Sequence, residues 1–369
     1  MNAPEPRLGD ARPAGAFAAA ADEADLERRF GALRRLYGEA GYAKLRSARI
    51  AVVGVGGVGS WAAEALARSG VAELVLVDLD HVAESNINRQ VQALTQTLGQ
   101  AKVQALAERI ALIHPGCRVR AVEEFAEAGN WPALLAPGLA RTAAAGATGA
   151  TGATVVPDAQ EATEATEATE ATEATEATGA TGATVATEAT EATEAACAAA
   201  IDAVIDACDD VRAKEVLARW CLRAKVPCVI AGAAGGKRRP EAVEVADLAE
   251  VTHDPLLAAL RQRLRRAGVI ARGDGRQAPR TAARPARGGL TCVFSREPVA
   301  APVPAVAAAG AGDAPACGPA PASDGSLNCA GYGSSVMVTA TFGFVAAAAA
   351  VSRVIDSPGP PPGRARESA

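Results

Sequence analysis

The segment RIAVVGVGGVGSWAAEALARSGVAELVLVDLD, residues 49–80, decides the fold of this chain. An apolar run, Arg49–Val53, is followed by the glycine-rich turn G-x-G-G-x-G and then by a helical pattern over 60–69. A second apolar run, Glu73–Val77, ends at Asp78. A glycine turn between a strand and a helix places backbone N–H groups around a phosphate. The segment therefore predicts a strand–helix–strand unit that binds a nucleotide.

The glycines of this turn have distinct tasks. Gly54 and Gly56 permit the tight turn, Gly57 lets the backbone touch a phosphate, and Gly59 allows the helix to pack close to the strand. Asp78, at the end of the second strand, suits a ribose hydroxyl. Nicotinamide, flavin and ATP enzymes all use this turn, so the glycines alone do not identify the nucleotide.

Polar residues beyond the second strand favour phosphate activation over hydride transfer. Asp80, the run SNINRQ at 85–90, and Lys102 follow at short intervals, whereas a nicotinamide needs an apolar slot. Arg89 and Lys102 suit the negative charge that accumulates when a carboxylate attacks an α-phosphate. Asp209, at the end of a later predicted strand, suits a metal that neutralises the leaving pyrophosphate. The alternative is that these are unrelated surface residues.

Apolar runs and helical patterns alternate through the rest of the chain. We expect strands at 49–53, 73–77, 118–123, 203–205 and 227–231. We expect helices at 26–42, 60–69, 101–113, 211–224 and 335–355, and another that begins at 131–135. Beyond Gly236 the pattern weakens, and loops are expected at 273–289 and 298–324. This order predicts an α/β fold with a doubly wound, mostly parallel, Rossmann-like sheet.

Triplets of the form GAT and EAT fill most of residues 146–194. A period of three matches neither a helix nor a strand and maintains no apolar face. We therefore expect a disordered low-complexity insertion at 136–198 that interrupts one α/β domain at 25–356. Disordered tails are expected at 1–24 and 357–369.

Charge and cysteine content narrow the class of protein. The repeat holds nine glutamates, and without them the formal net charge changes from −5 to +4. Arginines are dense between Arg261 and Arg287, which predicts either a surface for nucleic acid phosphates or a solvated loop. The eight cysteines contain no C-x-x-C pair, and the start of the chain has no signal-peptide pattern. We expect free thiols, a cytoplasmic location and no structural zinc.

Residues 336–351 are uncharged. The run is shorter than the ~18 residues that indicate a membrane span, so we expect a buried helix and no stable membrane insertion. Membrane association through this segment is the alternative.

The order G-x-G-G-x-G, D-x-D, S-N-x-x-R-Q, G-x-x-K and a later Asp resembles the pattern of the ubiquitin-activating-enzyme-like superfamily of adenylating enzymes. Four further phrases are similar to its family of tRNA threonylcarbamoyladenosine dehydratases: RFGALRRLYG at 29–38, AGAAGG at 231–236, CVFS at 292–295 and VMVTATFGF at 336–344. The likeness covers about Leu26 to Ile355, apart from the insertion.

The resemblance implies a set of site residues. It implies that Asp78 holds the ATP ribose, with Asp80 beside it, and that Asn86, Arg89 and Lys102 line the phosphates. It assigns the nucleotide contacts of the turn to Gly54, Gly56, Gly57 and Gly59. Arg89, Lys102 and Asp209 are the implied catalytic residues, with Asp209 supporting Mg²⁺. ATP and Mg²⁺ are the implied cofactors, and a monovalent cation stays open.

The implied function is ATP-dependent dehydration of threonylcarbamoyladenosine beside the tRNA anticodon, by adenylation and then cyclisation in a homodimer. Two alternatives are kept: an adenylyltransferase for the C-terminus of a small ubiquitin-like sulfur carrier, and a nucleotide-binding scaffold in sulfur transfer. Cysteine desulfurases or sulfur acceptors are candidate partners. Relatives place an arginine in the partner subunit's site, and here Arg29 or Arg35 is the candidate. Cys292 and Cys329 are expected to be buried thiols rather than thioester nucleophiles.

Overall fold

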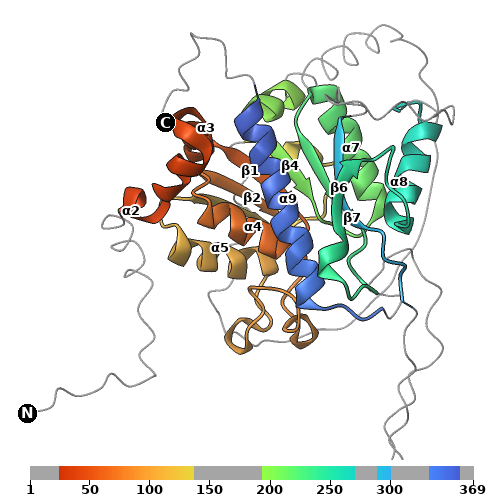
Figure 1. The fold of residues 1–369 in the computed structure, drawn as a ribbon, viewed down its shortest axis with the longest axis horizontal. Helices are drawn as coiled ribbons and strands as arrows, with labels where there is room; N and C mark the ends of the chain where they lie inside the picture. Colours follow the sequence, from red (N-terminus) through yellow and green to blue (C-terminus); the bar gives the residue numbers. More distant parts are fainter. Residues whose placement is uncertain (1–24, 137–192, 271–288, 301–331, 358–369) are drawn as a thin grey trace, which may run out of the picture.

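The protein is described by a computed structural model that covers residues 25–136, 193–270, 289–300 and 332–357 (Figure 1). Its strands form one seven-stranded sheet in the order β3-β2-β1-β4-β5-β7-β6. Every neighbouring pair is parallel except β6 and β7, which are antiparallel. The expected doubly wound, mostly parallel α/β fold is therefore confirmed.

The elements have the following bounds. The strands are β1 (Arg49–Val53), β2 (Glu73–Val77), β3 (Arg118–Val122), β4 (Ala203–Asp206), β5 (Cys228–Ala231), β6 (Val243–Asp247) and β7 (Leu290–Ser295). The α-helices are α2 (Leu26–Phe30), α3 (Ala32–Ser47), α4 (Gly59–Arg68), α5 (Lys102–Ile113), α7 (Val211–Ala224), α8 (Pro255–Arg266) and α9 (Val336–Asp356). Short 3₁₀ turns are η1 (Glu84–Asn86), η2 (Thr95–Thr97), η3 (Ala133–Leu135) and η4 (Pro240–Ala242).

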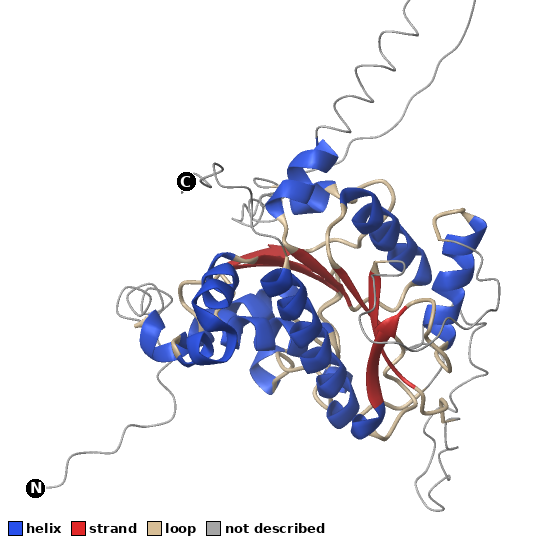
Figure 2. Cartoon of the chain, turned by 45° about the horizontal axis from the view of Figure 1, so that its top comes forward, coloured by secondary structure: helices blue, strands red, loops and turns tan. Residues whose placement is uncertain are grey.

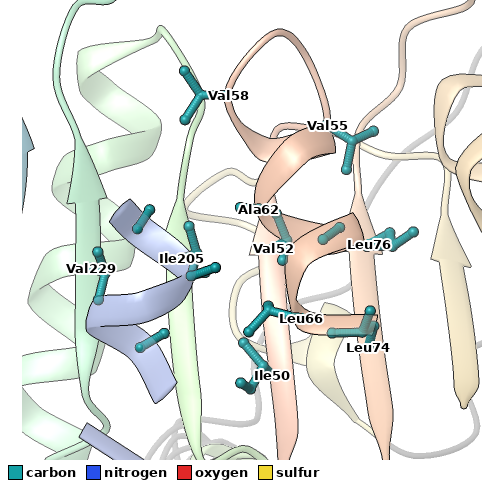
Figure 3. Packing of buried hydrophobic residues seen from close by; sticks show 14 of the residues in the cluster. Ile50, Val52, Val55, Val58, Ala62, Leu66, Leu74, Leu76, Ile205 and Val229 are labelled. Atoms are coloured by element: carbon teal, nitrogen blue, oxygen red, sulfur yellow. The ribbon is translucent and has the colours of Figure 1, made fainter. Parts of the chain in front are cut away.

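Helices cover both faces of the sheet, as Figure 2 shows. Successive strand residues point to opposite faces, so β1 contributes to two apolar cores. Ile50 and Val52 pack with Leu66 of α4 in the first core, which also holds apolar residues of α5 and α9 (Figure 3). Ala51 and Val53 pack into the second core with residues of α7 and α8. The sheet is thus buried on both faces, as its apolar strands require.

Several expected elements need correction. The helix expected to begin at 131–135 is only the single turn η3, and Ala136 after it is extended. The helix expected at 26–42 is two helices, α2 and α3, and Gly38 interrupts α3 with a φ of +71°. Three elements were not anticipated: β6, α8 and β7. The four arginines of α8 interrupt its apolar pattern, although its leucines are buried. β6 is an edge strand with little buried apolar surface.

The expected boundary of the insertion is also wrong at its C-terminal end. Residues 193–200 are helical, and Cys197 is fully buried in the second core. The packed domain therefore resumes by residue 193 rather than after 198. Residues 137–192 of the expected insertion, the expected tail at 1–24, all but Ser357 of the tail expected at 357–369, and Cys329 lie outside the described residues.

One helix among the described residues, α9, is long and apolar enough to cross a membrane, with a mean hydropathy of 1.7. It lies across the sheet and contacts α3 and α4 as well as β4 to β7 (Figure 1). Phe342, Ala346 and Ala350 on its inner side are fully buried in the first core. This packing is that of a core helix, and it gives no strong indication of membrane insertion.

Candidate nucleotide-binding site

A cavity of about 710 Å³ opens at the carboxyl ends of β1, β2, β4 and β5. The strand order reverses beside β1, and parallel sheets bind ligands at such switch points. Most of the residues expected at the site line this cavity: Gly54, Gly56, Gly57, Asp78, Asp80, Arg89, Lys102 and Asp209. Gly59 and Asn86 are not among its lining residues.

The glycine turn is held by close backbone contacts. Gly54 has a φ of +81°, and a Cβ on it would lie 2.8 Å from the backbone nitrogen of Cys208. A Cβ on Gly59 would lie 1.8 Å from the carbonyl oxygen of Gly54. Side chains are therefore excluded at both positions, and the start of α4 packs directly onto the end of β1.

Asp78 fastens the turn to the end of β2. Its Oδ2 accepts a hydrogen bond from the Val55 amide at 2.7 Å, and its Oδ1 accepts one from the Asp80 amide at 2.9 Å. Burial raises the pKa of the Asp78 carboxyl, although the charge of Lys102 and these backbone hydrogen bonds oppose the rise. Each carboxylate oxygen has a further lone pair, so Asp78 can still accept from a ligand hydroxyl.

Lys102 is the first residue of α5 and carries its ammonium group into the cavity. Its Nζ lies 2.7 Å from Oδ2 of Asp80, and its side chain is 8% exposed against 57% for Asp80. The backbone amide of Lys102 also donates to the Asp80 carbonyl at 2.9 Å, which ties α5 to the end of β2. A positive side chain at a helix N-terminus favours an anion there. A phosphate could displace the exposed Asp80 carboxylate.

Arg89 stands on the turn after η1. Its Nη1 donates to the Ser85 carbonyl at 2.7 Å and to Oδ1 of Asn88 at 3.0 Å, both of which are neutral acceptors. Burial lowers the pKa of the Arg89 guanidinium, which nevertheless stays charged. Trp61 of α4 fixes its backbone, since the indole Nε1 donates to the Arg89 carbonyl at 2.9 Å.

Asn86 is buried and shapes the turn that carries Arg89. Its Oδ1 accepts from the Ala83 amide at 3.1 Å, and its carbonyl accepts from the amides of Arg89 and Gln90. The structure therefore places Asn86 behind the cavity wall, where it positions Arg89.

Asp209 lines the cavity from the loop between β4 and α7. Beneath this loop, Nζ of Lys214 lies 3.0 Å from Oδ1 of Asp206, and both side chains are fully buried. Lys214 also donates to the Ala231 carbonyl at 2.9 Å. One buried ammonium thus joins the ends of β4 and β5 under the cavity floor.

A single cavity-facing carboxylate fits Mg²⁺, which is commonly bound by one or two carboxylates together with phosphates and water. Asp209 is such a group. Among the described residues there is no group of three or more His, Cys, Asp or Glu that could hold a metal by itself. Asp209, at the cavity wall, fits an ion whose other ligands are phosphate oxygens and water.

Neither described cysteine near the site is suited to nucleophilic attack. Cys208 lines the cavity, but its thiol donates to Oδ1 of Asp206, and burial together with this carboxylate raises its pKa well above the usual range. Cys292 is fully buried in β7 and outside the cavity lining, and burial raises its pKa as well. Thiolates are the reactive form, so both are inert in this state.

The two candidate in-trans arginines lie away from this cavity. Nη1 of Arg29 donates to the Ile113 carbonyl at 2.7 Å, at the end of α5 opposite Lys102. A helix of this length spans about 18 Å, so Arg29 does not reach its own chain's cavity. Arg35 is exposed on α3. A role in a partner's site stays a prediction for either residue.

Sequence reasoning missed several lining residues, among them Tyr332, Ser334 and Thr339 near the start of α9. The loop 124–128 after β3 was missed as well. Thr339 interrupts an apolar helical run, and that break in the pattern is the one signal that the sequence offered.

Comparison with known proteins gives consistent results. Residues 29–141 match the ThiF family. The chain is 34% identical over 332 residues to tRNA threonylcarbamoyladenosine dehydratase of Escherichia coli (strain K12), covering 89% of this chain and 94% of that protein. The Haemophilus influenzae protein of the same name is 32% identical over 333 residues, covering 90% and 94%.

Solved structures of the Escherichia coli dehydratase are similar to this chain. The crystal structure in complex with ATP has a TM-score of 0.59 and 33% identity, covering 90% of this chain and 96% of that chain. The structure in complex with AMP has a TM-score of 0.58, 32% identity and the same coverage.

Proposed function

Because the chain belongs to the tRNA threonylcarbamoyladenosine dehydratase family of ThiF-type proteins, we propose that it dehydrates threonylcarbamoyladenosine in tRNA at the expense of ATP. The observation that carries the proposal is the convergence of the glycine turn, Arg89, Lys102 and Asp209 on one cavity. These groups come from four separate segments, and together they form a site for a polyphosphate. The relatives solved with ATP and AMP support the same nucleotide.

The reaction has two stages. In the first, the carboxylate of the threonylcarbamoyl group attacks the α-phosphorus of ATP, and pyrophosphate leaves. In the second, an internal nitrogen or oxygen of the same modified base attacks the activated carbonyl, a ring closes, and AMP leaves. The overall loss is one water, which is consumed in splitting ATP. No nucleophile of the protein is required, because the attacking atom is already tethered to the carbonyl.

The residues of the chain supply binding and charge. Asp78 holds the ribose and keeps the glycine turn in place. Arg89 and Lys102 stabilise the negative charge that develops at the phosphates in the transition state. Asp209 would hold Mg²⁺, which neutralises the departing pyrophosphate when it is bound.

Two alternative functions make different predictions. An adenylyltransferase for a small sulfur carrier would show pyrophosphate exchange that depends on the carrier protein and not on modified tRNA. A nucleotide-holding scaffold would bind ATP without consuming it. The polar groups that do line the cavity, Asp78, Arg89, Lys102 and Asp209, disfavour the scaffold.

The test is in two parts. Nucleosides from cells that lack the protein are analysed by mass spectrometry, and the uncyclised base should accumulate. Purified protein should then form one AMP for each cyclic product on tRNA that carries threonylcarbamoyladenosine. Arg89→Ala should lower turnover by ~10²-fold or more while the protein stays folded, as expected for lost transition-state stabilisation. ATP consumption unrelated to tRNA product would exclude the proposal.

A homodimer in the cytoplasm is the proposed assembly. Large apolar side chains stand exposed on three helices that pack into the first core: Leu36 of α3, Leu112 of α5, and Met337 and Phe344 of α9. Exposed apolar side chains of this size favour burial against another subunit. Light scattering of the purified chain should give twice the monomer mass, and a monomer at micromolar concentration would refute this assembly.

A further inference from the structure

The first turn of α9 carries a buried hydroxyl that has no partner. Thr339 is 3% exposed, and its Oγ1 makes no hydrogen bond with any described residue. The same residue lines the cavity. A buried hydroxyl without a hydrogen bond is costly, and such a group in a native structure calls for an explanation.

The helix itself offers the usual solution, and Thr339 does not use it. A threonine within a helix commonly donates to the carbonyl four residues earlier. Two residues further along α9, Thr341 does so, and its Oγ1 lies 2.7 Å from the Met337 carbonyl. The equivalent carbonyl for Thr339 is that of Ser335, which among the described residues accepts from the backbone amides of Val338 and Thr339 and not from the Thr339 hydroxyl. The hydroxyl of Thr339 therefore keeps its donor unused.

The surroundings of Thr339 are those of the phosphate cradle. A Cβ built on Gly57 would lie 3.2 Å from Cγ2 of Thr339 and 3.4 Å from Cδ of Arg89, so both side chains border the glycine turn at one point. The guanidinium of Arg89 has only neutral acceptors among its hydrogen-bond partners. A guanidinium for which no ion pair with a described residue is seen is thus carried on a side chain that borders the glycine turn together with Thr339.

The N-terminus of α9 adds to this positive field. The helix is 21 residues long, and its first turn faces the cavity next to the start of α4. Ser335 caps it, since its Oγ accepts from the Met337 amide at 3.3 Å. The chain before the cap is anchored to the SNINRQ loop, because Nδ2 of Asn88 donates to the Ser334 carbonyl at 3.0 Å. The positive end of a long helix is therefore held in a fixed place.

We infer that Thr339 is a nucleotide-binding residue: on binding, its hydroxyl donates to a phosphate oxygen of ATP beside Arg89, and the N-terminus of α9 reinforces this contact. The inference rests on the proposed function to the extent that ATP is the ligand. It assigns to α9 a binding role in addition to its role in the core. It also explains why a hydroxyl is buried here without a partner among the described residues.

The experiment compares three variants by calorimetric titration with ATP and by thermal unfolding. Thr339→Val replaces the hydroxyl with a methyl group of similar size, Thr339→Ser keeps the hydroxyl, and Thr341→Val is the matched control in the same helix. A hydrogen bond to a charged acceptor contributes enough that Thr339→Val should weaken ATP binding about 10-fold to 100-fold. The other two variants should stay within about 3-fold of the wild type. Thr339→Val should unfold at no lower temperature than the wild type, since it removes an unsatisfied group.

Three results would overturn the inference. One is a Thr339→Val protein with wild-type affinity for ATP. Another is equal weakening by Thr339→Ser, which would assign the effect to the methyl group and to packing. The third is a Thr339→Val protein with normal ATP affinity and a raised KM for tRNA, which would place the hydroxyl at the threonylcarbamoyl group of the tRNA instead. A wild-type protein that binds no ATP would end both this inference and the proposed function, whereas failure of tRNA cyclisation alone leaves the binding result intact.

Discussion

Two lysine–aspartate pairs lie within the same nucleotide-binding region and differ in what surrounds them. Lys102 and Asp80 are 2.7 Å apart at the cavity, with 57% of the Asp80 side chain exposed. Lys214 and Asp206 are 3.0 Å apart beneath the cavity, with neither side chain exposed. Exposed ion pairs contribute little to stability, whereas a buried charge that loses its partner is very costly. A ligand could replace Asp80 as the partner of Lys102, whereas Lys214 and Asp206 are fully buried and out of a ligand's reach.

The surroundings of a buried basic group also decide whether it is protonated. Burial lowers the pKa of Lys214, but the charge of Asp206, its hydrogen bond to Lys214 and the neighbouring cysteines together outweigh burial, so the pKa of Lys214 is raised. His114, at the end of α5, is also fully buried, but its Nε2 contacts Nη1 of Arg46 at 2.9 Å and Arg29 lies nearby. Burial and these two arginines lower the pKa of His114 to about 4. The partner therefore decides whether a buried base is charged.

The largest expected effect comes from breaking the buried pair. Lys214→Met leaves the Asp206 carboxylate buried without its counter-charge, and one of its oxygens already lacks a hydrogen bond. The free energy of unfolding should fall by about 3–5 kcal/mol, measured by urea denaturation. The double variant Lys214→Met with Asp206→Asn should recover much of that loss. A Lys214→Met protein whose free energy of unfolding lies within about 1 kcal/mol of the wild type would show that the pair does not matter for stability.

The next effect is a pH dependence set by His114. Between about pH 6.5 and 4 the unfolded chain protonates this histidine and the folded chain does not, so stability falls as the pH falls. Relative to His114→Gln, the wild type should lose at most about 3 kcal/mol across this window, by the linkage of one proton. Urea titrations of both proteins at several pH values give the difference, in which the carboxylates common to both cancel. If the free energies of unfolding of the two proteins change with pH in parallel, the pKa of His114 is the same in the folded and unfolded states.

The substitution made at Lys214 has a matched counterpart in the cavity. Lys102→Met should cost less than about 1 kcal/mol of stability, because Asp80 remains hydrated after its partner is removed. Turnover should nevertheless fall by ~10²-fold or more, since a charge that stabilises the transition state is lost. Steady-state AMP formation and urea denaturation on the same sample separate the two effects. A folded Lys102→Met protein with near-wild-type turnover would remove Lys102 from the mechanism.

The smallest expected effect is on the acid of the exposed pair. Asp80→Asn should lower the free energy of unfolding by about 1 kcal/mol or less, because Asp80 is itself largely exposed and Asp78 remains as a negative neighbour of the mostly buried Lys102. Asp206→Asn, the same substitution in the buried pair, should cost several times more. Equal losses for the two variants, measured side by side by thermal or urea unfolding, would contradict the distinction drawn between the pairs.

Five of the seven strands of the sheet, β1 to β5, could be predicted, and the last two, β6 and β7, could not. β1 and β2 have the bounds expected from their apolar runs, and the glycine turn between the first strand and α4 stands where its motif placed it. β6 and β7 form an antiparallel pair at the far edge. The phrase CVFS at 292–295 lies in β7, but it indicated a family and not a strand. A short apolar run such as Leu290–Ser295 does not reveal its partner, because pairing across the sheet depends on long-range contacts.

The residues of the candidate site also divide into those that the sequence predicted and those that it did not. Motif order alone brought Arg89, Lys102 and Asp209 into one hypothesis, and the structure places all three on one cavity. Asn86 belongs to the same motif but stands behind the wall, since its amide group is used to hold the turn. Thr339 lies in the phrase VMVTATFGF at 336–344, but neither that phrase nor any motif assigned a binding role to Thr339 or a structural role to Lys214. Their importance depends on which neighbours they have or lack.

The sequence by itself determined the glycine turn of the candidate nucleotide site. The residues that shape this turn are neighbours along the chain, so their spacing in the sequence fixes their arrangement in space. The sequence also determined the fold class, because alternating apolar runs and helical patterns allow few arrangements. Only the tertiary structure decided which lysine is buried, which hydroxyl is unpaired and which helix points its positive end at the cavity. Those properties depend on solvent exclusion and on contacts between residues far apart in the chain, and no local pattern encodes them.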